Sequence, residues 1–115
     1  MAGRTRESIN DEIFERQAQI CKAFAHPGRL RILDLLGKGD RGVSELQKEL
    51  GCSKTTLSQQ ISILKSAGVL STRRNGKQIY CSLAIPEVKQ ACLLIREVLR
   101  AQIAATHRLH EPLEE

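Results

Sequence analysis

The chain has 115 residues, enough for one domain with a modest hydrophobic core, and only 3% of them are aromatic. No apolar run reaches the roughly 18 residues that a membrane-spanning helix needs, and no secretory signal pattern opens the sequence. The four cysteines are widely spaced without a Cys-x-x-Cys pair, so we expect reduced thiols in a cytoplasmic protein and not a disulfide framework.

The net charge of +5 is concentrated in the middle of the chain. Between Gly51 and Pro86 the sequence carries five bases and no acid, while the other 13 bases are balanced by 13 acids. A positive field confined to one third of a chain most often marks a nucleic-acid-binding surface. An anionic membrane would need a basic helix with exposed apolar anchors, and the one basic helix here needs its apolar residues for the core.

The first third of the chain predicts two helices. Residues 1–8 are polar and basic and are expected to be mobile, whereas residues 9–25 have apolar side chains at helical spacing. Pro27 breaks this first helix and is suited to open the second. The second helix is short and strongly apolar, and Gly37 and Gly39 are expected to end it.

A third, shorter helix and a turn come next. Ser44 and Gln47 have the spacing of a capping box, which would start this helix. After a glycine-containing turn at 51–53, residues 53–66 predict a fourth helix with apolar residues at i, i+4 and i+7 along one face. Two short helices joined by such a turn are typical of a helix-turn-helix.

The opposite face of the helix over 53–66 is polar and basic and has no carboxylate. Its members are Lys54, Thr55, Ser58, Gln59, Ser62 and Lys65. Side chains of this kind suit contact with phosphates and base edges, and Ser53 at the N-cap position leaves backbone N–H groups that attract phosphate. An ordinary surface helix whose polar residues face water is the alternative explanation.

A hairpin is predicted after the basic helix. The strand-like runs 69–74 and 77–83 are joined by Asn75-Gly76, a strong signal for a two-residue type I′ turn. That register places Arg74 opposite Lys77. Because like charges facing each other across strands cost stability, a basic hairpin tip suggests an anionic partner. A helix-turn-helix followed by a basic hairpin predicts a winged helix.

Pro86 is expected to open a long final helix that is apolar on one broad face to about Ala105. The long helices at the two ends carry more apolar surface than so small a domain needs, so we expect an isologous homodimer. A dimer suits DNA because two recognition helices about 34 Å apart reach successive major grooves. The predicted fold is mainly α with a small β-hairpin: a winged helix-turn-helix at 9–110 that dimerises through its N- and C-terminal helices, with a tail at 111–115.

The chain also resembles the ArsR/SmtB family of bacterial winged-helix repressors from about Ile13 to Leu99. The matching segments are AFAHPGRLRIL at 23–33, VSEL at 43–46, LSQQI at 57–61, LKSAGVL at 64–70 and GKQIYCSL at 76–83. The resemblance implies a cytoplasmic homodimer that binds an operator with inverted repeats and is released by an inducer.

By the same resemblance, polar residues of the fourth helix would contact bases and backbone, and bases of the wing would reach flanking phosphates or the minor groove. Glutamine can pair bidentately with adenine, and serine or threonine can bond to either phosphate or base. The predicted DNA-binding set is Lys54, Thr55, Ser58, Gln59, Gln60, Ser62, Arg73, Arg74 and Lys77.

Many members of the family sense metals or metalloids, but this sequence differs at their usual ligand positions. Gly42 to Ser44 stand where paired cysteines would open the third helix, and the ligands of the last helix align with Ile85, Glu87, Val98 and Ala101, which cannot form a tetrahedral zinc site. The two cysteines of persulfide-sensing relatives align with Asp34 and Arg100.

Two other groups are candidates for sensing an inducer. Cys21 and Cys92 lie on the two terminal helices and would form a thiol or metalloid sensor if those helices bring them together, although cysteine is also a common small core residue. His107, His110 and Glu111 have spacing that suits zinc or nickel, although a solvent-exposed helix end is the simpler explanation. We assign no cofactor.

The sequence thus predicts a sequence-specific DNA-binding repressor that is released by a metal, a metalloid or a thiol oxidant. The alternative is a winged-helix module that binds proteins, whose affinity would depend little on salt. We do not expect an enzyme, because no histidine neighbours a cysteine in a recognisable catalytic motif and no glycine-rich phosphate loop is present.

Overall fold

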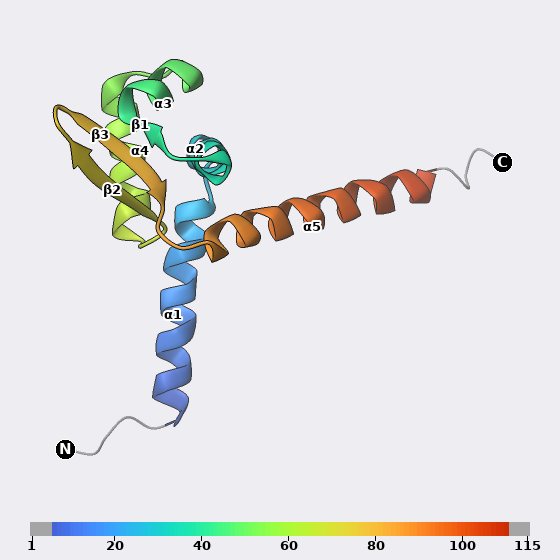
Figure 1. The fold of residues 1–115 in the computed structure, drawn as a ribbon. Helices are drawn as coiled ribbons and strands as arrows, with labels where there is room; N and C mark the ends of the chain where they lie inside the picture. Colours follow the sequence, from blue (N-terminus) through green and yellow to red (C-terminus); the bar gives the residue numbers. More distant parts are fainter. Residues whose placement is uncertain (1–5, 111–115) are drawn as a thin grey trace.

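The computed structural model describes the backbone of residues 6–110 and the side chains of residues 10–107. This part of the chain forms five helices and a three-stranded antiparallel sheet (Figure 1). The elements are α1 Arg6–Phe24, α2 Pro27–Lys38, β1 Arg41–Gly42, α3 Val43–Leu50, α4 Lys54–Ser66, β2 Leu70–Asn75, β3 Gln78–Leu83 and α5 Glu87–His110. The arrangement is a winged helix-turn-helix, as predicted, with β2 and β3 as the wing.

The core lies between the helix-turn-helix and the wing. Leu57, Ile61 and Leu64 of α4 are buried, as the spacing of the apolar residues predicted. They join Leu46 of α3 and Cys81 of β3 in one cluster with the apolar side of α2. Packing between these elements buries the apolar side of α4, which leaves its polar side for solvent.

Two helix ends differ from the expectation. Gly39, at φ +152°, is the C-cap of α2, as predicted, whereas Gly37 lies inside the helix and does not end it. At α3 the N-cap is Gly42, whose N–H donates to Glu45 Oε1 at 3.1 Å. The predicted capping box at Ser44 is therefore wrong, because pairing of β1 holds the chain extended as far as Gly42.

The start of α4 was predicted correctly. Ser53 is its N-cap, and the Ser53 hydroxyl oxygen accepts a hydrogen bond from the Thr56 backbone N–H at 3.1 Å. The second helix opens at Pro27, also as predicted. The final helix begins one residue after Pro86.

The wing has a different register from the predicted one. Asn75 pairs with Gln78, so the two turn residues are Gly76 and Lys77. A type I′ turn needs positive φ at both positions, and only Gly76, at φ +65°, has it. Glycine at positive φ in the first position is the pattern of a type II′ turn.

This register removes the opposed charges that the sequence suggested. Arg74 lies opposite Ile79, and Arg73 lies opposite Tyr80. The basic wing tip therefore gives no evidence of like-charge strain. The sheet also contains β1, which the sequence did not predict and which pairs with β3 to give the order β1-β3-β2.

The two long helices leave the body of the domain in different directions (Figure 1). Large apolar side chains on them are exposed: Ile13, Phe14 and Ile20 on α1, and Leu93, Leu94, Ile95, Val98, Leu99 and Ile103 on α5. The chain exposes 8857 Å², whereas a compact monomer of this mass exposes about 6,300 Å². None of the described helices is both long enough and apolar enough to span a membrane.

Candidate nucleic-acid interface

The polar side of α4 forms a continuous exposed face. Burial of Leu57, Ile61 and Leu64 fixes the rotation of the helix, so Ser58, Gln59 and Ser62 point outward. Of the predicted polar face, Lys65 is exposed in the last turn of the helix, and five residues are exposed before it: Lys54, Thr55, Ser58, Gln59 and Ser62. We call these five side chains the α4 face. They offer hydroxyl, amide and ammonium groups and no carboxylate, which is the chemistry that phosphates and base edges require.

A shallow cleft joins the α4 face to the tip of the wing. Its volume is about 210 Å³, and its lining comes from the starts of α3 and α4 and from the wing: Val43, Ser44, Lys54, Lys77, Gln78 and Ile79. Within the described residues, neither Lys54 nor Lys77 has a carboxylate within ion-pair distance. The cleft therefore concentrates positive charge that no described protein group neutralises.

Ser44 and Gln78 line this cleft but were absent from the predicted DNA-binding set. The sequence did not identify them because Ser44 was assigned to a helix cap and Gln78 to a strand interior. Both side chains reach the cleft only because the wing folds back over the start of α3. A polar residue next to a hairpin turn was the one available signal, and it is a weak one.

The three bases of the wing differ in their surroundings. Arg73 Nη1 donates to Asp40 Oδ2 at 2.8 Å, and its guanidinium lies 5.2 Å from the centre of the Tyr80 ring. In the described part of the chain, Arg74 and Lys77 have no such partners and are exposed. The segment between Gly51 and Pro86 contains no acid, but Asp40 from outside it forms an ion pair with Arg73, one of the three wing bases.

Gln60 lies apart from the α4 face. It is half-buried, and its Oε1 accepts a hydrogen bond from Arg29 Nη1 of α2 at 2.9 Å. Gln59, one residue earlier, is exposed. The contribution of Gln60 to DNA binding stays a prediction, and in this structure its amide oxygen is occupied inside the protein.

The candidate thiol sensor is divided between the two long helices. Cys21 is exposed on α1, whereas Cys92 is half-buried on α5 against the core. Burial raises the pKa of the Cys92 thiol, the positive charge of Arg96 lowers it less, and the negative charge of Asp34 raises it slightly. A raised pKa leaves less of the reactive thiolate of Cys92 at neutral pH, whereas Cys21 is exposed to solvent in the single chain.

The candidate metal ligands at the end of α5 are only partly described. His107 lies within the described residues, and the side chains of His110 and Glu111 lie outside them. Among the side chains that the structure does describe, no three histidine, cysteine, aspartate or glutamate residues lie close enough to hold a metal ion.

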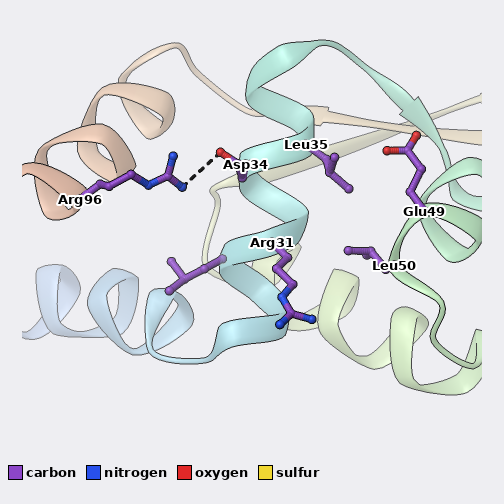
Figure 2. A pocket seen from close by; sticks show the side chains of 7 residues that line it. Arg31, Asp34, Leu35, Glu49, Leu50 and Arg96 are labelled. Carbon is purple, nitrogen blue, oxygen red and sulfur yellow. Dashed lines mark hydrogen bonds and ion pairs between the residues drawn. The ribbon is translucent and has the colours of Figure 1, made fainter. Parts of the chain in front are cut away.

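An ion pair between Arg96 and Asp34 links α5 to α2. Asp34 Oδ1 accepts a hydrogen bond from Arg96 Nη2 at 3.2 Å across the gap between the helices (Figure 2). Arg100 pairs with Glu97 on its own helix. Beside the bridge is an open hollow of about 310 Å³, with Leu35 and Leu50 facing each other between α2 and α3 (Figure 2).

Comparisons with known proteins agree with this geometry. The family model described as "Bacterial regulatory protein, arsR family" matches residues 26–72. The chain is 37% identical over 91 residues to the uncharacterized HTH-type transcriptional regulator Rv0081 of Mycobacterium tuberculosis, covering 78% of this chain and 80% of the relative. It is 33% identical over 106 residues to the biofilm growth-associated repressor of Xylella fastidiosa, covering 89% and 93%.

A solved structure gives the same fold. The NMR structure of a homodimeric winged helix-turn-helix DNA-binding domain from Mycobacterium bovis superposes with a TM-score of 0.77 at 33% identity. The match covers 87% of this chain and 91% of that one.

Because the thiol of Cys81 is buried, we expect the free energy of unfolding to depend on pH. Burial raises the pKa of Cys81 above its ordinary value, and the positive charge of Lys65 offsets part of the rise. A thiol whose pKa is higher in the folded chain than in the unfolded chain stabilises the fold below the unfolded pKa. That stability is lost as the pH rises through the folded pKa. We expect the free energy of unfolding to fall above about pH 9, and Cys81→Ala to reduce that fall.

Urea unfolding at several pH values between neutral and about pH 10 measures this contribution. Cys21→Ala is the matched control, because Cys21 is exposed and its removal should leave the pH profile as in the wild type. An unchanged alkaline slope in Cys81→Ala would contradict the prediction.

Proposed function

Because the chain belongs to the ArsR family of bacterial regulatory proteins, we propose that it binds an operator with inverted repeats as a homodimer and represses transcription there. Its relatives are transcriptional regulators, and some of them are named as repressors. The observation that carries the proposal is the α4 face, which is exposed, free of carboxylates and continuous with a positively charged cleft. We place this activity in the cytoplasm, where bacterial operator DNA lies.

In the proposed complex α4 enters the major groove. Ser58, Gln59 and Ser62 lie along its exposed side and are the residues that we expect to reach base edges. Lys54 stands at the first turn of α4, where backbone N–H groups are also available, and we assign it to a phosphate. Thr55 is next to it and suits either role.

The wing contacts the backbone beside that groove. Arg74 and Lys77 are exposed without partners among the described residues, so no internal ion pair must break when they meet phosphate. Arg73 would have to exchange the carboxylate of Asp40 for a phosphate oxygen. We therefore assign most of the wing's electrostatic contribution to Arg74 and Lys77.

The proposed partner subunit is a second copy of the chain. The exposed apolar residues of α1 and α5 would remain in water in a monomer, at a cost of about 25 cal/mol for each Å² of apolar surface. The excess over a compact monomer is about 2,600 Å² per chain, which is more than the roughly 600–1,000 Å² that each partner buries in a standard protein–protein interface. A homodimeric relative with the same fold supports a dimer here.

We also propose that a small inducer releases the protein from DNA by acting on a thiol. The candidate thiols differ in access, since Cys21 is exposed and Cys92 is half-buried with a raised pKa. Cys21 follows Ile20 on the side of α1 that we assign to the dimer interface, so modification of this thiol would act directly on the dimer.

Specific DNA contact can be separated from electrostatic contact. We expect Gln59→Ala to weaken operator binding by about 5- to 150-fold while non-specific binding and its salt dependence stay near the wild-type values. Arg74→Ala combined with Lys77→Ala should instead weaken both kinds of binding and reduce the salt slope by about one for each phosphate that the variant no longer binds.

Fluorescence anisotropy with operator and scrambled duplexes, measured over a range of salt concentrations, gives both affinities and both salt slopes. The two variants act as controls for each other, because each should change what the other leaves intact. Equal weakening of specific and non-specific binding in Gln59→Ala would remove its base-reading role. A wild type whose affinity hardly depends on salt would favour a protein-binding module.

The dimer has its own test. Leu94 is 67% exposed on α5, and Leu94→Glu would place a charge in the proposed interface. We expect sedimentation to give the mass of two chains for the wild type and of one chain for the variant at low micromolar concentration. Lys48→Glu places a carboxylate at an exposed position of α3, away from both long helices, and should stay dimeric. A wild type that sediments as a single chain would refute the dimer.

Thiol sensing is tested by release of operator DNA. Operator complexes of the wild type, Cys21→Ser and Cys92→Ser are treated with diamide, arsenite, zinc or nickel. We expect Cys21→Ser to lose most of any response to diamide and arsenite, since modification of its thiol would act directly on the dimer. If all three proteins release DNA identically under every treatment, these cysteines are not the sensor.

A further inference from the structure

One arginine connects three helices. Arg29 of α2 donates from Nε to the carbonyl oxygen of Ala23 at 2.6 Å and from Nη2 to that of Lys22 at 3.1 Å, both in the last turn of α1. Its third donor, Nη1, reaches Oε1 of Gln60 on α4 at 2.9 Å. A single guanidinium thus joins a long outer helix to the helix that carries the proposed DNA contacts.

These bonds have a clear physical effect at α1. The last carbonyl groups of a helix have no partner within the helix, and a cation there also interacts favourably with the helix dipole. The guanidinium is a planar fork with fixed donor directions, so two carbonyls of α1 determine where its third donor points. Lysine has one freely rotating ammonium group and cannot hold the three acceptors in this geometry.

Side-chain packing does not fill the space between α1 and α4. An open groove of about 360 Å³ lies there, lined by Gln19, Lys22, Ala23, Arg29, Ile63, Ser66 and Ala67. A groove leaves the two helices room to tilt, because little close contact resists the movement. The hydrogen bonds of Arg29 cross from one wall of this groove to α4.

We propose that Arg29 is a positioning residue that sets the angle between α1 and α4. In a dimer formed through the long helices, this angle fixes the separation of the two recognition helices. Arg29 then determines which half-site spacing the protein accepts, although it touches no base. Gln60 takes part from the inner side of α4, next to the outward-facing Gln59. The effect on half-site spacing rests on the proposed function, whereas the effect on the angle between α1 and α4 does not.

The angle is measured without DNA. Spin labels are attached at Glu15→Cys on α1 and Ser62→Cys on α4, both exposed positions outside the proposed dimer interface, in a background where serine replaces Cys21, Cys52 and Cys92. Cys81 is fully buried and is retained. An excess of unlabelled protein leaves at most one labelled chain per dimer, so electron–electron resonance reports the distance within one chain.

We expect a narrow distance distribution in the otherwise wild-type protein and a broader one in Arg29→Lys and in Gln60→Ala. Gln60→Ala removes a single hydrogen bond and keeps the contacts with α1, so it folds even if Arg29→Lys does not. Arg31→Lys is the matched control, because Arg31 is an exposed arginine of the same helix with no bonded partner among the described residues. Its distribution should be that of the parent.

The consequence for DNA is measured with operators of native spacing and with one base pair inserted between the half-sites. The unchanged protein should strongly prefer the native spacing. Arg29→Lys should bind the native operator on the order of tenfold more weakly, with a smaller reduction for the longer operator, so that the preference shrinks. Non-specific binding should stay within about twofold, because the side chains that meet phosphate are all retained.

Unchanged distance distributions in both Arg29→Lys and Gln60→Ala would overturn the positioning role, whatever the DNA results are. Broader distributions with an unaltered spacing preference would overturn the link to the operator. If the wild type binds no operator, the proposed function fails, and the distance measurement by itself decides whether Arg29 sets the angle.

Discussion

Burial of Leu57, Ile61 and Leu64 determines what the rest of the protein can do. Turning α4 to expose this stripe would forfeit about 1.5–3 kcal/mol for each of the three side chains. The net stability of a small domain is about 5–15 kcal/mol. Because the summed loss is of the same order, the folded chain keeps α4 in this rotation. Ser58, Gln59 and Ser62 must then face outward, and the α4 face is a direct consequence of core packing.

The charge of the outward surface depends on which acids the fold brings near it. The segment from Gly51 to Pro86 contains no acid, but Asp40 reaches the wing from the loop before β1 and pairs with Arg73. Lys54 and Lys77, which line the cleft, have no carboxylate within ion-pair distance among the described residues. Since the proposed partner is a polyanion, that cleft is where its backbone would meet the least competition.

The two long helices present a second constraint. The domain body has one core, and α1 and α5 contribute to it mainly where they join the body, through Ala23, Phe24 and Val88. Beyond that region their apolar faces are exposed. A symmetric partner would bury those faces and would also place two copies of α4 side by side. The orientation of α1 relative to α4 then matters for recognition, which gives the hydrogen bonds of Arg29 their importance.

Features that depend on neighbouring residues could be predicted from the order of amino acids alone. Helical spacing located the buried stripe of α4, Ser53 was identified as its N-cap, and the change of period after Gly68 located the wing. Long-range packing was needed to establish the pairing of Asn75 with Gln78, the strand β1, and the bonds of Arg73 with Asp40 and of Arg29 with Gln60. Those bonds join residues that are 33 and 31 positions apart. The spacing of a local pattern cannot encode such contacts, because they form only after packing has set the register of the strands and the rotation of the helices.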